Sequence, residues 1–172
     1  IGSAAREMTM ELIRRYTQAV PTGALLFCFF FSVYALSIYG QPRYGDEMER
    51  YLQAQSLVDR QTWVIRRIPG HDALGADGKN YYSQFELGYG LLLVPPYVVG
   101  RVVSTFFPYG DRDWIPALFV SLSNPLITAL TCVVLFEFSR ALGVRRRTAV
   151  WISLIFGLGT LAWPYAKGIY RE

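Results

Sequence analysis

Two adjacent acids, Asp46 and Glu47, are the residues of this sequence best placed to do chemistry, because they closely follow a long apolar run. A carboxylate in such a place can act as a general base toward the hydroxyl group of a sugar or a protein. It can also hold a divalent cation against a phosphate. Adjacent acids in a loop usually only begin a solvated helix, so either role requires neighbouring helices that shield the pair from water.

Long apolar runs are the elements that must position this pair. No formal charge occurs between Arg15 and Arg43, from 114 to 136, or from 148 to 166. A helix of about 20 residues crosses a hydrocarbon core of about 30 Å, and inside a bilayer only helices or closed barrels satisfy the backbone. Because alternating barrel strands are not evident, we predict an all-α integral membrane protein with about four membrane-embedded helices.

The order of apolar and polar segments predicts a single membrane domain. Within the polar segment, apolar residues recur at helical spacing from Met48 to Val58 with charged residues between them, which is typical of an amphipathic helix at a membrane surface. The domain, residues 1–172, is expected to comprise a cytoplasmic N-terminus at 1–20, a span at 21–39, an extracytoplasmic loop at 40–86 with a helix at about 46–60, a spanning or re-entrant segment at 87–107, and spans at 114–138 and 148–166.

Charge indicates the orientation of the chain. Arg6, Arg14 and Arg15 precede the first span, as the positive-inside rule expects for a cytoplasmic N-terminus. The chain has 17 Lys and Arg against 13 Asp and Glu, and we assign this excess to membrane lipids, because the interleaved basic and aromatic residues of a nucleic-acid surface are not evident. We therefore expect a plasma or inner membrane protein whose residues 40–86 lie outside the cytoplasm and bind no nucleic acid.

The segment 87–107 leaves two arrangements open, because it contains Pro95, Pro96 and Arg101 within an apolar run. If the segment spans, the basic residues 145–147 lie outside. If it is re-entrant or interfacial, they lie inside, as the positive-inside rule prefers. We favour four spans, in which Arg101 reaches the far interface, and both arrangements place residues 40–86 outside.

Other candidate residues have simpler interpretations. His71 is a lone loop histidine, which is typical of a solvated or structural residue rather than a metal ligand. Cys28 and Cys132 both lie in apolar runs, where reduced cysteines pack like small hydrophobic residues. Gly157 and Gly159 follow no strand, so we interpret them as sites of close helix packing and not as a phosphate-binding loop.

Several motifs, in order, resemble the start of a GT-C membrane glycosyltransferase. The similarity is to the protein O-mannosyltransferase and lipid A aminoarabinose transferase families and their bacterial relatives. It covers about residues 20–172 and corresponds to only the N-terminal part of such an enzyme. The residues that carry it are Gly45-Asp46-Glu47, Tyr51, Ala54–Leu57, Asp77–Pro95, Asn124–Leu130, Leu142-Gly143 and Gly159–Glu172.

The resemblance implies an inverting transfer of a sugar from a polyprenyl-phosphate donor to a hydroxyl acceptor at the outer membrane face. In such enzymes an acid in the first outer loop lies beside the acceptor. Asp46 would accordingly be the base or the acceptor-positioning residue, with Glu47 supporting it. The sugar phosphate would need cationic or hydrogen-bonding partners, for which the candidates are Arg66, Arg67, Lys79 and Tyr82.

The resemblance leaves the metal requirement open. In the aminoarabinose transferases a Glu-Lys pair at the end of this loop contacts metal and phosphate. Here Ser83 and Gln84 stand at about that place and Glu86 is displaced. A divalent metal is therefore a possible cofactor, and Glu86 is a candidate binding residue.

Two alternatives to an enzyme remain. The first is a non-catalytic membrane subunit derived from this family, which packs against partner helices, lipids or pigments in a larger complex. The second, a transporter fragment, is disfavoured because Arg101 and Glu137 are the only charges within the apolar segments, near their ends.

Because the sequence begins at Ile1 rather than Met, we interpret it as a fragment, which favours the enzyme; a complete chain of 172 residues would favour the subunit. With four spans, Glu172 would be cytoplasmic.

Overall fold

The computed structural model describes residues 21–43, 45–68, 78–107 and 113–168. The described chain is mostly helical, which confirms the predicted helical class. A short antiparallel ribbon pairs Val64 with Tyr82 and Ile65 with Tyr81. The elements are α2 (Thr22–Ala35), α3 (Asp46–Arg60), β1 (Val64–Ile65), β2 (Tyr81–Tyr82), α4 (Leu87–Ser104), α5 (Trp114–Ser121), α6 (Ser123–Ala141), α7 (Arg146–Gly159) and α8 (Ala162–Ala166).

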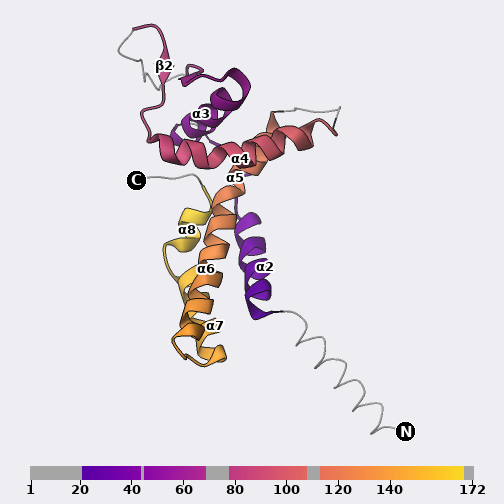
Figure 1. Cartoon of the computed structure of the whole chain (residues 1–172), viewed down its shortest axis with the longest axis vertical. Coiled ribbons are helices and arrows are strands. Elements are labelled where there is room, and N and C mark those ends of the chain that lie inside the picture. The colour runs from indigo at the N-terminus through magenta and orange to yellow at the C-terminus, as the bar shows by residue number, and fades with distance from the viewer. Residues whose placement is uncertain (1–20, 44, 69–77, 108–112, 169–172) are drawn as a thin grey trace, which may run out of the picture.

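The helices form two groups that meet near one end of α6. Figure 1 shows α2, α6, α7 and α8 as an upright group, while α4 runs across its upper end with α3 and the ribbon above it. α5 leads from the crossing layer into α6, and the two helices are separated only by Leu122. Pro125 lies in the first turn of α6, where its missing N–H costs little.

The upright group packs around apolar side chains from α2, α6, α7 and α8. On α2 the buried positions Gly23, Leu26, Phe30 and Tyr34 are three or four residues apart and therefore share one face of the helix. Large apolar side chains on the outer surface, such as Val134 at 65% and Ile155 at 63% exposure, remain uncovered. The shared core consists of Leu26, Phe30, Tyr34, Ala129, Cys132, Phe136, Ala149 and Ala166.

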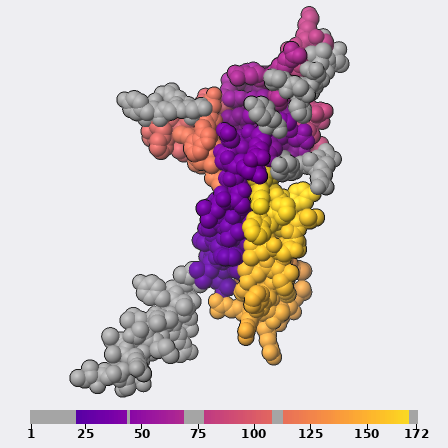
Figure 2. All heavy atoms as spheres, turned by 180° about the vertical axis from the view of Figure 1, so that it is seen from behind, coloured from indigo at the N-terminus to yellow at the C-terminus, as the bar shows by residue number. Residues whose placement is uncertain are grey.

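Gly157 leaves room on α7 for side chains that reach it from α2 and α6. A Cβ atom there would overlap the Phe30 ring and lie 2.9 Å from the Cys132 sulfur. The Tyr34 hydroxyl uses this space and donates a hydrogen bond of 2.8 Å to the Gly157 carbonyl. Figure 2 shows the consequence, with the indigo α2 beside the yellow end of the described chain. Gly157 is thus a packing position, whereas Gly159 meets only Ile155 of its own helix.

The crossing layer has a second core between α3, α4, α5 and the ribbon. The rings of Tyr51 and Tyr97 meet edge to face with centroids 5.7 Å apart. Tyr97 donates a hydrogen bond of 2.6 Å to Asp59, which also pairs with Arg101 at 3.4 Å. These contacts fix α3 along α4. The buried members of this core are Tyr51, Leu52, Ala54, Ile65, Ile68, Leu93, Tyr97, Ala117 and Val120.

Two described helical stretches are long and apolar enough, by length and composition, to cross a membrane: Leu87–Ser104 and Trp114–Ala141. α2 is a shorter apolar helix. These helices support the membrane association of the chain. The structure does not confirm four membrane helices, and α4, one of the two candidates, runs across the upright group rather than beside its helices (Figure 1).

The structure also does not confirm the amphipathic pattern expected for the helix at 46–60. Tyr51 and Leu52 are buried as expected, but Glu49 is fully buried and Arg50 is only 5% exposed. The physical reason is that α3 is covered on two sides. Its apolar residues pack in the core shared with α4 and α5, and its polar residues Glu49 and Arg50 contact the segment that leads into α4.

Candidate functional site

The acids of the predicted site begin α3. Gly45 precedes the helix with φ of 90°, a backbone conformation that glycine adopts without strain. Its carbonyl accepts the hydrogen bond of the Glu49 N–H at 3.0 Å and closes the first turn. Asp46, Glu47 and Glu49 all lie in this turn, where negative charge interacts favourably with the helix dipole.

Two of these three carboxylates bind the backbone of neighbouring segments. Glu47 is buried and accepts a hydrogen bond of 2.8 Å from the Arg43 N–H, in the segment that follows α2. Glu49 accepts one of 2.6 Å from the Gln84 N–H, in the segment that precedes α4. Together they tie the start of α3 to both flanking segments. Asp46 is half-buried, so its carboxylate is the most accessible of the three.

A cluster of buried polar side chains lies next to these acids, between α3 and the start of α4. The Arg50 guanidinium lies 4.6 Å from the ring centroid of Phe85 and 5.0 Å from that of Tyr89, in cation–π contact with both. Gln53 packs against Gly90, where any Cβ atom would overlap its side-chain oxygen. Glu49 Oε2 and Gln53 Oε1 are buried without a hydrogen-bond partner among the described residues.

This polar cluster is what sequence reasoning missed. Glu49 and Gln53 are four residues apart and therefore share one face of a helix, which is the only signal the sequence offers. That signal is weak because the same spacing is typical of solvated helix surfaces. Burial of charged groups costs free energy unless they are paired. We therefore regard the cluster as part of the site and not as incidental packing.

A hydrogen-bonded connection runs from this cluster into the upright group. The Tyr89 hydroxyl donates a bond of 2.7 Å to the Asn124 side-chain oxygen at the start of α6. The Asn124 amide in turn donates to the carbonyl of Gly168 and, at 3.4 Å, to that of Tyr165. The chain just after α8 thus lies at the same end of the upright group as α3 and α4.

The other predicted binding residues lie on the ribbon and at the start of α4. Arg66 and Arg67 are exposed just after β1, and the Arg67 guanidinium lies 5.6 Å from the Tyr81 ring centroid. Lys79 is exposed before β2, and Tyr82 lies in β2 with 38% exposure. The pairing of β1 with β2 brings these four residues onto one ribbon.

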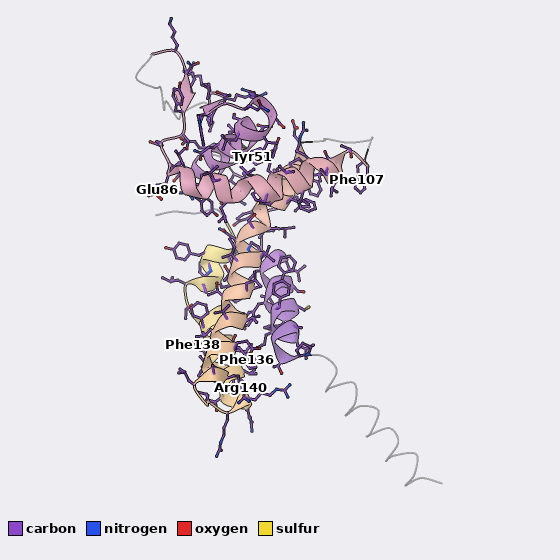
Figure 3. All side chains as sticks on the ribbon, in the orientation of Figure 1. Tyr51, Glu86, Phe107, Phe136, Phe138 and Arg140 are labelled. Carbon is purple, nitrogen blue, oxygen red and sulfur yellow. The ribbon has the colours of Figure 1, made fainter. Side chains whose placement is uncertain are left out.

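Glu86 is exposed and immediately precedes α4, two residues after the Gln84 N–H that binds Glu49. Figure 3 shows it at the opposite end of α4 from Phe107, with Tyr51 of α3 above the middle of the helix. Within the described residues, groups of three or more His, Cys, Asp or Glu that could hold a metal ion are absent. His71, Glu172 and the arginines of the N-terminal segment lie outside the described residues.

Comparison of this chain with protein-family models, curated proteins and solved structures found no match. Its function must therefore be argued from the arrangement of its own residues. In that arrangement the half-buried Asp46 begins α3, whose first turn is held to both flanking segments by Glu47 and Glu49. This helix lies above one end of the upright group (Figure 1).

Proposed function

We propose that this chain is a glycosyltransferase-like membrane protein. It transfers a sugar from a polyprenyl-phosphate donor to a hydroxyl acceptor at the outer face of the plasma or inner membrane, with inversion. The observation that carries the proposal is the division of roles at the start of α3. Glu47 and Glu49 are buried and bind backbone N–H groups, whereas Asp46 is only half-buried.

The membrane orientation that we propose has α2, α6 and the pair α7 and α8 crossing the bilayer, with α4 along the outer surface. Support comes from α4 itself, whose direction crosses that of α6 (Figure 1). A stripe of exposed apolar residues follows one side of this helix and is suited to the interface between headgroups and acyl chains. The stripe consists of Leu91, Leu92, Val98, Val99 and Val102.

The two ends of the upright group agree with this orientation. Tyr89 and Asn124 hold the chain after α8 at the end that carries α3 and α4. Thr22 and Arg146 line a common groove at the opposite end. Basic residues 145–147 then lie on the same side as the start of α2, which is the cytoplasmic side by the positive-inside rule. This is the interfacial alternative for segment 87–107, with three spans instead of four.

In the proposed reaction, Asp46 accepts the proton of the acceptor hydroxyl as that oxygen attacks the anomeric carbon of the sugar. The bond between this carbon and the phosphate oxygen breaks, and its electron pair leaves with the polyprenyl phosphate. Attack opposite the leaving group inverts the anomeric centre. Because the lipid carrier delivers the donor in the plane of the bilayer, the reaction needs no nucleotide-binding fold.

The donor phosphate is assigned to basic and polar groups of the ribbon. The candidates Arg66, Arg67, Lys79 and Tyr82 are brought together by the pairing of β1 with β2. Arginine and lysine both bind phosphate through charged hydrogen bonds. Glu86 lies beside the segment held by Glu49 and is the candidate for the acceptor side or for a divalent cation.

The test is Asp46→Asn in the protein purified and reconstituted in lipid vesicles with undecaprenyl-phosphate-linked sugars. We expect sugar transfer to fall by about 100-fold or more, the usual effect of losing a general base. Glu137→Gln removes the same charge at the opposite end of the upright group and should leave transfer unchanged. Normal turnover in a correctly folded Asp46→Asn protein would eliminate the assignment.

A second candidate function, a non-catalytic subunit of a larger membrane complex, is favoured by one observation. Large apolar side chains of α6 and α7 are exposed along the upright group, including Leu130 at 48% and Trp151 at 55%. Partner helices, lipids or pigments would cover these surfaces. Stable co-purification of a partner, together with the absence of sugar transfer in the wild-type protein, would support this candidate over the first.

A further inference from the structure

A groove lies at the end of the upright group opposite to the acids, between the start of α2 and one side of α7. Its volume is about 500 Å³. α2 contributes a hydroxyl group, and α7 contributes two guanidinium groups, an indole and two aliphatic side chains. The lining residues are Thr22, Arg146, Arg147, Val150, Trp151 and Leu154.

The lining changes from basic to apolar along α7. Arg146, Val150 and Leu154 are spaced by four residues and share one side of the helix. At 1.5 Å per residue, the positions from Arg146 to Leu154 extend over about 12 Å. The groove therefore presents positive charge at one end and a hydrocarbon surface along its length. A phospholipid has the same division between its phosphate and its acyl chains.

The charge at this end of the molecule favours an anion. Its described charged residues are four arginines, at 140, 145, 146 and 147, and the single acid Glu137. The Arg140 guanidinium donates to the Val144 carbonyl at 2.7 Å. The Glu137 carboxylate is directed toward Gly23 of α2, where a Cβ atom would lie 3.0 Å from it. Arg146 and Arg147 are the exposed cations that line the groove.

We propose that this groove binds an anionic phospholipid of the cytoplasmic leaflet. Arg146 and Arg147 bind the phosphate, and the Thr22 hydroxyl donates to a headgroup oxygen. Val150 and Leu154 contact an acyl chain, while Trp151, which is 55% exposed, lies at the level of the headgroups. The proposal rests on the membrane orientation proposed above, but it is independent of the chemistry of Asp46.

Charge complementarity selects a lipid over a partner helix as the occupant. A helix that covered both Arg146 and Arg147 would have to supply buried acids at matching positions, whereas an anionic lipid brings its charge to the headgroup level and an acyl chain to the apolar wall. Zwitterionic lipids carry a compensating positive charge and should bind less well.

The experiment measures lipid retained by the purified full chain, using native mass spectrometry from nanodiscs that contain equal phosphatidylglycerol and phosphatidylcholine. The wild-type chain should retain phosphatidylglycerol preferentially. Arg146→Gln combined with Arg147→Gln should reduce that retention by about tenfold or more, because charged hydrogen bonds to the phosphate are lost. Arg145→Gln is the matched control, since Arg145 is exposed in the same triplet but does not line the groove.

A second variant tests the apolar wall without changing charge. Leu154→Trp fills the groove and should also lower retention of phosphatidylglycerol. Equal retention of both lipids, full retention in the double variant, or an equal loss in Arg145→Gln would each overturn the proposal. Displacement of the lipid by inorganic phosphate would also overturn it, because the groove would then be a simple anion site.

The proposed lipid site and the proposed catalytic role of Asp46 can be contradicted independently of each other. Asp46→Asn should retain phosphatidylglycerol like the wild-type chain, whatever its effect on sugar transfer. Retention that fell in this variant would contradict the assignment of the lipid to the groove at the opposite end.

Discussion

At the scale of single residues, three acids within one helical turn have different roles. Glu47 and Glu49 are buried and accept backbone hydrogen bonds from segments on either side of α3. Asp46 is half-buried and binds neither segment through these contacts. From the sequence alone, Asp46 and Glu47 were predicted to act as one pair, because adjacent acids have the same chemistry. Their separate roles depend on which side of α3 each occupies and on what covers that side.

The structural role of Glu49 can be tested by stability. Glu49→Ala removes the acceptor of the Gln84 N–H and should lower the free energy of unfolding by about 1.5–3 kcal/mol, the usual contribution of a hydrogen bond to a charged group. Glu49→Gln keeps one acceptor oxygen and should cost less. The measurement is denaturant titration in mixed micelles. Asp46→Asn should remain near wild-type stability, and an equal loss in that variant would contradict the division of roles.

At the scale of elements, the positions of the helices in the sequence were predictable, but the direction of α4 relative to the upright group was not. Apolar runs without charge predict helices in a bilayer whatever their packing partners. The run at 87–107 is also apolar but contains Arg101, and its Pro95, Pro96 and Arg101 fit a span near an interface as well as a surface helix. Only the contacts of α4 with α3 and α5 fix its direction, and contacts between distant segments are not visible in one sequence. The burial of Glu49 and Arg50 escaped prediction for the same reason.

The contact of the α2 side chains Phe30 and Tyr34 with α7 depends on the missing side chain of Gly157. In Gly157→Ala the new Cβ would overlap the Phe30 ring and crowd the Tyr34 hydroxyl at 2.8 Å. We expect the free energy of unfolding to fall by about 1–3 kcal/mol, as in other overpacked cores.

The control for this change is Gly159→Ala, because a Cβ there meets only Ile155 at 3.9 Å. Alanine favours helix over glycine by about 1 kcal/mol, so this variant should be neutral or stabilised. Denaturant midpoints in mixed micelles compare the two proteins. Equal midpoints would show that the Phe30 and Tyr34 side chains do not lie as close to Gly157 as the Tyr34 hydrogen bond requires.

At the scale of the whole molecule, the upright group separates the helix that begins with Asp46 from the groove lined by Arg146 and Arg147. α6 has 19 residues and at 1.5 Å per residue is about 28 Å long, close to the thickness of a hydrocarbon core. Asp46 and its helix lie at one end, and the groove of Arg146 and Arg147 lies at the other. The two proposed activities therefore belong to opposite faces of one membrane, and the orientation of the chain decides both.

Cysteine labelling of intact cells tests this orientation. In a chain that carries Cys28→Ala and Cys132→Ala, we introduce Tyr82→Cys on β2 or Arg145→Cys before α7, both at exposed positions. A membrane-impermeant maleimide added outside should label position 82 directly and position 145 only after permeabilisation. This outcome is expected because three spans, with α4 on the outer surface, place the two positions on opposite sides.

Labelling of both from outside would mean that α4 crosses the bilayer. Labelling of position 145 alone would place Asp46 in the cytoplasm, where a donor carried in the outer leaflet cannot reach it.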